Sequence, residues 1–402
     1  MRDGWAEVAF RDLCRLVVDR RDASDVDGVP YVGLEHMPSG SPAIRAPGTT
    51  NGLASQVVAF QPNDILFGRL RPYLRKVARP DFAGVCSPEI LVLRPVADRV
   101  LPGYLYALAA SDPVIRWAVS ASAGSRMPRT TASDLLAFRV PLPPLAEQRR
   151  IVDVVGAVDE LRQQAAAVTS ASRQAAGALV ETALEEAEHP LVPLRDLAAE
   201  KGLIGGPFGS SLRTRDYAPH GVPVINGGNH SDWETCLIGP FQFLSVEKTH
   251  ELRRNAALPG DVVATNQGSV GQVSLVPEGA FDRYVVSQRQ LRLRLRTDVV
   301  SPNYIVAVLR GKAAQAELAS QTIRTGVSHI NLRIFGDLRV PLPPLDRQVV
   351  IAEQFDAANA VALAARLLHG RLDRLRSALL AGLLSGQHEI PASYDRFLDG
   401  AA

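Results

Sequence analysis

The chain has 402 residues, of which 46% are hydrophobic and 21% are charged. This usage argues against a disordered or fibrous protein, and the length predicts two globular cores. No run of about 18 apolar residues is present and residues 1–5 do not begin a signal peptide, so we expect a cytoplasmic protein without a membrane span. Cys14, Cys86 and Cys236 form no CxxC pair, which predicts buried thiols rather than disulfides or a zinc site.

The formal net charge of +2 hides an uneven distribution along the chain. Residues 1–140 carry +3 and residues 190–340 carry +4, whereas residues 141–189 carry −4 and residues 341–402 carry −1. Positive charge on two segments is typical of surfaces that bind nucleic acid. Arginine outnumbers lysine 40 to 4, which suits bidentate contacts to phosphate or guanine, although a GC-rich coding bias gives the same ratio.

Residues 1–140 predict a mixed α/β domain. Residues 62–66 and 90–93 are β-type runs next to turn signals, and residues 102–110 have the composition of a helix. Two polar loops in this domain carry the cationic and aromatic side chains that DNA recognition requires. The candidate DNA-binding residues on these loops are Arg69, Arg71, Tyr73, Arg75, Lys76, Arg126 and Arg129.

A proline-rich segment follows the first domain and recurs after the second. Residues 139–145 read Arg-Val-Pro-Leu-Pro-Pro-Leu, and the same seven residues stand at 339–345, with Gln148 and Gln348 three positions further on. Seven identities at an offset of 200 indicate a tandem duplication. Because the prolines fix φ and exclude the helical conformation before them, we expect each copy to form a stiff, extended elbow. A proline-rich ligand for a partner domain is the alternative.

Residues 190–340 repeat the first domain more weakly, with residues 259–263 in the place of residues 62–66. We expect a second mixed α/β domain, in which loop amides could pair with adenine and arginines with phosphate. Its candidate DNA-binding residues are Ser210, Ser211, Arg213, Arg215, Asn266, Gln267, Ser269, Arg324, Ser328 and His329. In both domains, a solvated polar surface is the alternative for each loop.

Each elbow leads into about 40 residues without proline, enough for one helix of about 60 Å. Apolar residues recur there at alternating spacings of three and four, which is the pattern of a coiled-coil seam. Packing of each stripe against its own domain is the alternative. The predicted seam consists of Ile151, Val154, Val158, Leu161, Val168, Leu179, Ile351, Val361, Leu368, Leu372, Leu375 and Leu379.

These patterns predict a mixed α/β fold with two globular domains and two long helices that pair along a coiled-coil seam. The predicted boundaries are 1–140 for the first domain, 141–189 for the first elbow and central helix, 190–340 for the second domain, 341–388 for the second elbow and distal helix, and 389–402 for a tail.

No catalytic motif accompanies these elements. The chain lacks a GxxxxGK[ST] phosphate loop, an HExxH motif, a GxSxG elbow, a GxGxxG turn and the Asn/Asp-Pro-Pro-Tyr segment of adenine methyltransferases. None of its four lysines follows an acidic residue by two positions, as nuclease sites require, and its eight histidines are dispersed. We therefore predict a chain that does not catalyse a reaction by itself and binds neither a metal nor a cofactor.

Several of these motifs resemble those of the specificity subunit of type I restriction-modification systems, over essentially the whole chain. They are the two elbows with their glutamines, the helix after each elbow, Gly-Pro-Phe-Gly-Ser-Ser at 206–211, Gly-Asp-Val-Val at 260–263, and the closing residues 379–386. The resemblance implies two target-recognition domains that each read one half of an asymmetric, interrupted DNA site, with the helices as spacers. It also implies that the two helices pack antiparallel, which would give the duplicated chain pseudo-two-fold symmetry. The first domain departs from the pattern because it lacks the Gly-Pro-Phe-Gly-Ser-Ser opening.

The same resemblance implies partners that the sequence does not contain. Two methyltransferase subunits would dock on the helices, bind S-adenosylmethionine and methylate adenine in double-stranded DNA. Restriction subunits would add translocation and cleavage that depend on ATP and Mg, in defence against phage. A coiled-coil scaffold protein, and the specificity subunit of a related defence system without restriction, are the alternative functions.

Overall fold

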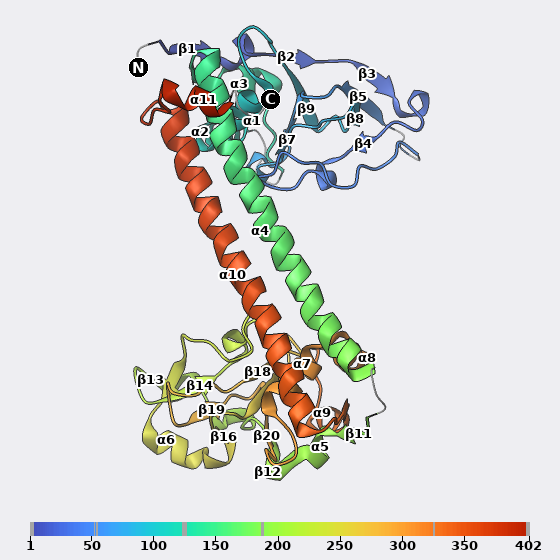
Figure 1. The fold of residues 1–402 in the computed structure, drawn as a ribbon, viewed down its shortest axis with the longest axis vertical. Coiled ribbons are helices and arrows are strands. Elements are labelled where there is room, and N and C mark those ends of the chain that lie inside the picture. Colours follow the sequence, from blue (N-terminus) through green and yellow to red (C-terminus); the bar gives the residue numbers. More distant parts are fainter. Residues whose placement is uncertain are drawn as a thin grey trace. The chain divides into compact units, whose positions relative to one another are not determined.

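The computed structural model describes residues 4–51, 53, 55–122, 127–185, 189–324 and 326–398, without the side chain of Ser210 (Figure 1). The chain divides into two compact units, of which the first contains Met1–Arg162 and Gly370–Ala402 and the second contains Gln163–His369. Each unit combines one globular domain with part of each of two long helices, α4 (Leu145–Glu185) and α10 (Leu345–Leu384).

The domain of the first unit is built on two four-stranded sheets with the orders β2-β9-β6-β7 and β3-β5-β8-β4. Three short helices, α1 (Pro102–Ala109), α2 (Asp112–Ser120) and α3 (Ala132–Ala137), share an apolar core with β2, β6 and β9. The strands of this unit are β1 (Ala6–Ala9), β2 (Cys14–Val17), β3 (Arg20–Asp22), β4 (Tyr31–Val32), β5 (Gln56–Phe60), β6 (Ile65–Gly68), β7 (Val77–Ala78), β8 (Gly84–Cys86), β9 (Ile90–Pro95) and β10 (Arg139–Leu142).

The domain of the second unit repeats this plan with a sheet of order β12-β20-β17-β18 and a five-stranded sheet of order β13-β15-β14-β19-β16. Its strands are β11 (Leu191–Pro193), β12 (Ala198–Gly205), β13 (Tyr217–Ala218), β14 (Val222–Ile225), β15 (Gln242–Leu244), β16 (Ala256–Ala257), β17 (Val262–Thr265), β18 (Val273–Leu275), β19 (Tyr284–Val286), β20 (Gln290–Leu295) and β21 (Arg339–Pro341). Its short helices are α5 (Leu194–Leu197), α6 (Val246–Glu251), α7 (Pro302–Arg310), α8 (Lys312–Gln321) and α9 (Leu332–Asp337).

The duplication extends to individual side-chain pairs. Buried Asp64, at the start of β6, accepts hydrogen bonds from Arg94 at 2.7 and 2.9 Å. Asp261, before β17, accepts two equivalent hydrogen bonds from Arg294, at 2.7 and 2.8 Å. The predicted correspondence between residues 62–66 and 259–263, and the predicted mixed α/β domains, are therefore confirmed.

The two proline elbows are extended, as predicted, and each is held within its own unit. β10 pairs antiparallel with β1, and β21 pairs antiparallel with β11. The glutamine after each elbow is fully buried. Gln148 donates to the carbonyls of Arg99 and Pro143 and accepts from the amide of Leu101, at 2.9 to 3.0 Å.

Gln348 makes the equivalent three bonds in the second unit. It donates to the carbonyls of Val299 and Pro343 and accepts from the amide of Ser301, at 2.8 to 3.2 Å. Each glutamine thus ties the start of a long helix to the segment that precedes α1 or α7, which explains why it accompanies both elbows.

Within each unit the parts of α4 and α10 pack antiparallel. In the first unit, Ile151 and Val155 of α4 share a core with Leu380 and Leu384 of α10. In the second unit, the shared core is formed by residues nearer the other ends of the helices, Ala176, Val180 and Ala183 of α4 and Ile351, Ala352 and Phe355 of α10. The predicted long helices are therefore confirmed, and each domain rests on parts of both.

The seam residues differ in part from the predicted ones. Ile151, Val158, Ile351 and Leu372 are buried, and Val154 and Leu379 are half-buried. The six other predicted seam residues are exposed, which corrects the prediction: Leu161, Val168, Leu179, Val361, Leu368 and Leu375.

The reason for this error is that small and polar residues continue the seam through the middle of each helix. In α4 the buried or half-buried face passes through Val158, Arg162, Ala165 and Thr169, which keeps the spacing of four and three. The large apolar residues Leu161 and Val168 lie on the neighbouring, exposed face. A pattern of large apolar residues alone therefore identifies the wrong face of the helix.

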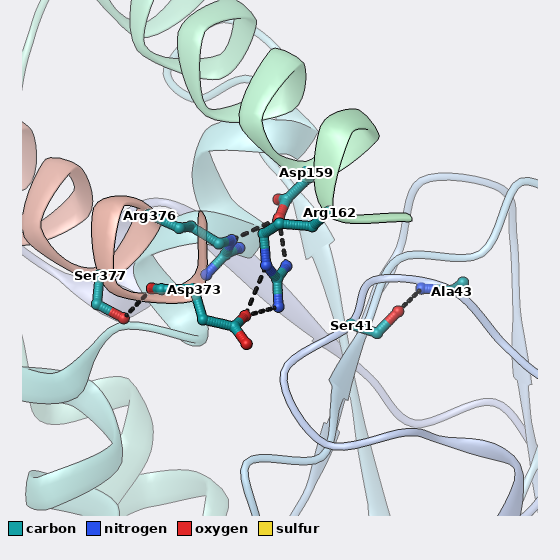
Figure 2. Close-up of polar contacts among 7 residues, drawn as sticks. All are labelled: Ser41, Ala43, Asp159, Arg162, Asp373, Arg376 and Ser377. Atoms are coloured by element: carbon teal, nitrogen blue, oxygen red, sulfur yellow. Dashed lines mark hydrogen bonds and ion pairs between the residues drawn. The ribbon is translucent and has the colours of Figure 1, made fainter. Parts of the chain in front are cut away.

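Four charged residues replace apolar ones where the helices meet in the first unit (Figure 2). Asp159 accepts hydrogen bonds from Arg162 on its own helix and from Arg376 on α10, both at 2.6 Å. Arg162 also donates to Asp373 of α10 at 2.7 Å. The four charges alternate in sign across the two helices. Each arginine is therefore paired with a carboxylate where packing of the helices partly buries it.

Cys14 and Cys86 are buried free thiols, as predicted, and Cys236 is a half-buried one. Burial raises the pKa of the Cys14 and Cys86 thiols to about 12. Within the described ranges, no helix is both long and apolar enough to cross a bilayer. The same residues bring together no group of three His, Cys, Asp or Glu side chains that could hold a metal ion.

Candidate nucleic-acid interface

Three loops that are distant in sequence cross one another in the first unit. They are residues 69–71 after β6, residues 87–89 between β8 and β9, and residues 128–130 before α3. The amide of Arg69 donates to the carbonyl of Glu89 at 2.9 Å, and the amide of Arg71 donates to that of Pro128 at 2.8 Å. The amide of Thr130 donates back to the carbonyl of Arg69 at 3.0 Å. We call this arrangement the loop crossing.

The second unit contains the same loop crossing, formed by residues 266–268, 287–289 and 328–330. The amide of Asn266 donates to the carbonyl of Arg289 at 3.0 Å, and the amide of Gly268 donates to that of Ser328 at 3.0 Å. The amide of Ile330 donates to the carbonyl of Asn266 at 2.9 Å. The two units therefore have the same backbone arrangement at the loop crossing, whereas the side chains on it differ.

Two predicted residues of the first unit, Arg69 and Arg71, lie at the centre of its loop crossing. The buried Nε of each guanidinium has no hydrogen-bond partner among the described residues. Arg71 adopts a left-handed conformation with φ 50°, where the second unit has Gly268 with φ 88°. A non-glycine residue costs about 1 kcal/mol or more in this conformation. Arg71 therefore occupies a position where glycine would be the more stable residue.

Arg75 and Arg129, two further predicted residues, are already paired with acidic side chains. Arg129 forms a bidentate pair with Glu89 at 2.9 and 3.0 Å. Arg75, also left-handed with φ 52°, pairs with Asp112 of α2. Both guanidinium groups are partly exposed.

The remaining predicted residues of the first unit differ in exposure. Tyr73 is exposed, and Lys76 donates to the carbonyl of Leu34 at 2.5 Å. Arg126 lies outside the described residues. A DNA contact by these residues stays a prediction.

In the second unit, the Gly-Pro-Phe-Gly-Ser-Ser segment lies against the loop crossing. The amide of Gly206 donates to the carbonyl of Gln290 at 2.9 Å. A Cβ on Gly206 would stand 1.8 Å from the carbonyl oxygen of Ser287, so only glycine fits there. Gln288 donates to the carbonyl of Leu212 at 2.6 Å, which fixes the segment from its other end.

Residues of this segment, and those just after it, that were predicted to bind DNA are on the surface. Ser211, Arg213 and Arg215 are exposed, and the amide of Arg213 donates to Asp216 at 2.7 Å. The side chain of Ser210 lies outside the described residues. Phe208 is also exposed, although it was not predicted as a contact.

The other predicted residues of the second unit lie at or near its loop crossing. Gln267 and His329 face each other in a short antiparallel bridge. The backbone carbonyl of Ser328 accepts a hydrogen bond from the amide of Gly268. Arg324 and Ser269 are exposed. The buried Oδ1 of Asn266 has no partner among the described residues.

A polar cavity of about 680 Å³ opens beside this loop crossing. The polar side chains that line it include Asn226, Gln267, Gln272, Gln288, Arg289 and Gln290. Sequence reasoning missed five of these residues, all except Gln267. The signal that could have found three of them is the polar run Ser-Gln-Arg-Gln at 287–290, between apolar strands.

The sequence model of the protein family described as the type I restriction modification DNA specificity domain matches residues 3–168 and again residues 211–368. The chain belongs to this family. The first match covers the first domain and the second covers most of the second domain, and each extends into the long helix that follows. The family unit is therefore present twice, in agreement with the duplicated fold.

Relatives within the specificity-domain family are distant in sequence. The specificity subunit of the type I restriction enzyme EcoDI of Escherichia coli is 24% identical over 152 residues, 37% of this chain and 34% of that protein. The specificity subunit of the MjaVIII enzyme of Methanocaldococcus jannaschii is 20% identical over 96% of this chain and 93% of its own. The chain is thus matched to about a third of the first relative and to most of the second.

The fold of the specificity-domain chain also has solved counterparts. The S subunit of a type I restriction-modification system from M. genitalium covers 94% of this chain and 96% of its own, with a TM-score of 0.61 and 12% identity. This likeness concerns the fold, and the DNA sequence that each protein recognises does not follow from it.

Proposed function

We propose that this chain is the subunit through which a type I restriction-modification complex recognises its DNA sequence. The observation that carries the proposal is the loop crossing, which is built twice on one backbone plan and carries different side chains in the two units. Arg69, Arg71 and Arg129 stand in the first unit where Asn266, Gly268 and His329 stand in the second. Each domain would read one half of an interrupted site, and the two halves would differ.

The chemistry of the two loop crossings suits different base edges. Guanidinium groups such as that of Arg71 form bidentate contacts to guanine or to phosphate. Side-chain amides such as those of Gln267 and Gln288 pair with adenine. We therefore expect contacts to guanine or phosphate in the first half-site and to adenine-thymine pairs in the second.

Partners would supply the chemistry that the chain itself does not perform. We propose that two methyltransferase subunits with S-adenosylmethionine, and restriction subunits with ATP and Mg, assemble on it in the cytoplasm. Exposed apolar side chains on the long helices, such as Leu161, Val361 and Leu368, support docking of protein there. In this arrangement the chain selects the site and its partners methylate or cleave.

The sequence of the recognised site is the first test. Co-expression of the chain with its methyltransferase subunits, in a host without adenine methylation, should create an interrupted motif with two unlike halves in the sequenced methylome. A continuous motif, or the same motif in cells without this chain, would contradict the proposal.

Arg71→Gly tests the loop crossing directly. Glycine relaxes the left-handed conformation, so the melting temperature of the first unit should stay equal or rise by about 2–4 °C. Loss of the guanidinium should weaken binding of the assembled complex to its own site about tenfold or more. Lys201→Gly is the matched control, because Lys201 is also left-handed, with φ 54°, and is exposed outside the loop crossing. Equal DNA affinity in both variants would remove Arg71 from the interface.

A further inference from the structure

A chain of hydrogen bonds crosses the interior of the second domain and ends at the polar cavity. Arg310, the last residue of α7, donates to Oγ of Ser274 in β18 at 3.2 Å. Oγ of Ser274 lies 3.0 Å from Nδ1 of His230, and Nε2 of His230 lies 2.8 Å from Oε1 of Gln290. The hydroxyl of Thr265 donates to the same Oε1 at 3.3 Å. We call these five residues the relay.

The relay determines which end of the Gln290 amide is held by His230 and Thr265. Since Arg310 can only donate, Ser274 is free to give its own proton to Nδ1 of His230. His230 then carries its proton on Nε2 and donates to Oε1 of Gln290. The amino group of Gln290 is left pointing away from the relay.

Burial keeps His230 in the form that this arrangement requires. Desolvation lowers the pKa of His230 to about 4, so the imidazole is neutral near pH 7. A neutral imidazole has one donor and one acceptor nitrogen, which are the two roles that the relay assigns to it.

The amino group of Gln290 has no partner of its own. Gln290 is fully buried and lines the cavity, and its Nε2 makes no hydrogen bond to any described residue. Gly227 lies next to it, since a Cβ at this position would be in van der Waals contact with Nε2, at 3.9 Å. A buried donor without an acceptor costs about 1–3 kcal/mol.

The first unit shows that the sheet does not need this polar group. Gln290 stands opposite Thr265, and Ile90 stands opposite Gly68 at the same place of the first unit. Ser274 stands opposite Val263, and Ala78 stands opposite Leu66. By the same correspondence of elements, the relay residues Arg310, Ser274, His230, Gln290 and Thr265 are replaced by Ala110, Ala78, Met37, Ile90 and Gly68.

The equivalent region of the first unit is an apolar core. Met37, Ala78 and Ile90 belong to one buried cluster. Leu34 stands where the second unit has Gly227, and its side chain reaches to 2.9 Å from the place of a Cβ on Gly68. An apolar solution therefore exists for this fold, and the second domain carries a relay with an unmatched donor instead.

We propose that Gln290 is a base-reading residue of the second domain, which donates a hydrogen bond through its amino group to an acceptor atom on a base edge of the DNA. The inference rests on the proposed function and deepens it. Neutral amides rather than cations dominate the polar lining of the cavity, which favours a base edge over a phosphate. Candidate acceptors are N7 or O6 of guanine, N7 or N3 of adenine, and O4 or O2 of thymine.

The experiment uses the complex of this chain with its methyltransferase subunits and duplexes that carry the motif found by methylome sequencing. Gln290→Glu keeps the size of the side chain and its acceptor toward His230, but replaces the donor in the cavity by a carboxylate. Gln290→Met removes the donor without adding charge. Gly227→Leu copies the first unit and closes the space in front of Nε2.

All three variants should bind the motif about tenfold or more weakly, with the loss confined to one base pair of the second half-site. Purines that lack one acceptor atom, such as 7-deazaadenine, 7-deazaguanine or 3-deazaadenine, locate the contact. At one position such a purine should weaken the wild-type complex and leave the Gln290→Met complex unchanged. Gln56→Glu, an exposed residue of β5 with the same change of charge, should keep the wild-type preferences.

The outcomes separate this inference from the function on which it rests. A wild-type complex that methylates its motif, while Gln290→Glu and Gln290→Met show the same affinity and base preference, would overturn the inference alone. A uniform loss across all sequences with a changed salt slope would assign Gln290 to phosphate and also overturn it. A chain that directs no methylation at all would overturn the proposed function itself.

Discussion

Removal of Asp159 is the sharpest test of how the long helices are held together in the first unit. Asp159 accepts hydrogen bonds from Arg162 and Arg376, one on each helix. Asp159→Ala would leave Arg376, whose side chain is only 11% exposed, without the carboxylate that it pairs with. Asp373 is the matched control, since it belongs to the same cluster and accepts from Arg162.

Burial sets the expected magnitude. The side chain of Asp159 is 13% exposed and that of Asp373 is 44% exposed. Breaking a buried ion pair by removing one partner costs about 3–5 kcal/mol, and an exposed pair contributes about 0–1 kcal/mol. With a discount for the water that still reaches the cluster, we expect a loss of about 2–3 kcal/mol for Asp159→Ala and about 1 kcal/mol for Asp373→Ala.

Calorimetry can resolve this difference. A unit of about 200 residues loses roughly 2–4 °C of melting temperature for each kcal/mol, so Asp159→Ala should lower the transition of the first unit by about 4–12 °C. Asp373→Ala should lower it by about 2–4 °C. Equal shifts in the two variants would refute the argument from burial. A wild-type melting temperature for Asp159→Asn would show that the charge of Asp159 is not needed.

Two further predictions concern buried polar groups. Gln148→Ala and Gln348→Ala each remove three hydrogen bonds, so each should destabilise its own unit by about 2–4 kcal/mol; an unchanged calorimetric transition would contradict the role of the elbow glutamines. Burial lowers the pKa of His230 from its ordinary 6.5 to about 4 in the folded chain, so the unfolded state takes up a proton first as the pH falls. The second unit should therefore keep its full stability above about pH 6.5 and lose up to about 3 kcal/mol by pH 4. His230→Met, which copies the first unit, should lack this part of the acid loss, and equal acid sensitivity of the two proteins would argue against a buried neutral His230.

The duplication and the elements that depend on local sequence could be predicted without a structure. The elbow prolines restrict their own φ and the residues before them, whatever surrounds them. Forty residues without proline and with recurring apolar spacing form a helix for equally local reasons. The five motifs of residues 139–145, 339–345, 206–211, 260–263 and 379–386 were also enough to indicate the family that the comparison then confirmed.

The seam could not be predicted in full, because partners on another helix decide which face is buried. Ala165 and Arg162 are poor markers of a core when read in sequence. Arg162 is tolerated in the seam because Asp159 and Asp373 supply carboxylates at hydrogen-bond distance. The exposed Leu161 and Leu368, by contrast, satisfied the sequence pattern without contributing to the seam.

The loop crossings and the relay are likewise products of tertiary structure. The sequence identified several of the loops that cross, because arginine, amide and glycine residues gather in them. It did not show that residues 287–290 lie at their centre, or that His230 holds the amide of Gln290. His230 and Gln290 are 60 positions apart in sequence, and only the tertiary structure brings Nε2 of His230 to 2.8 Å from Oε1 of Gln290, in the wall of the cavity.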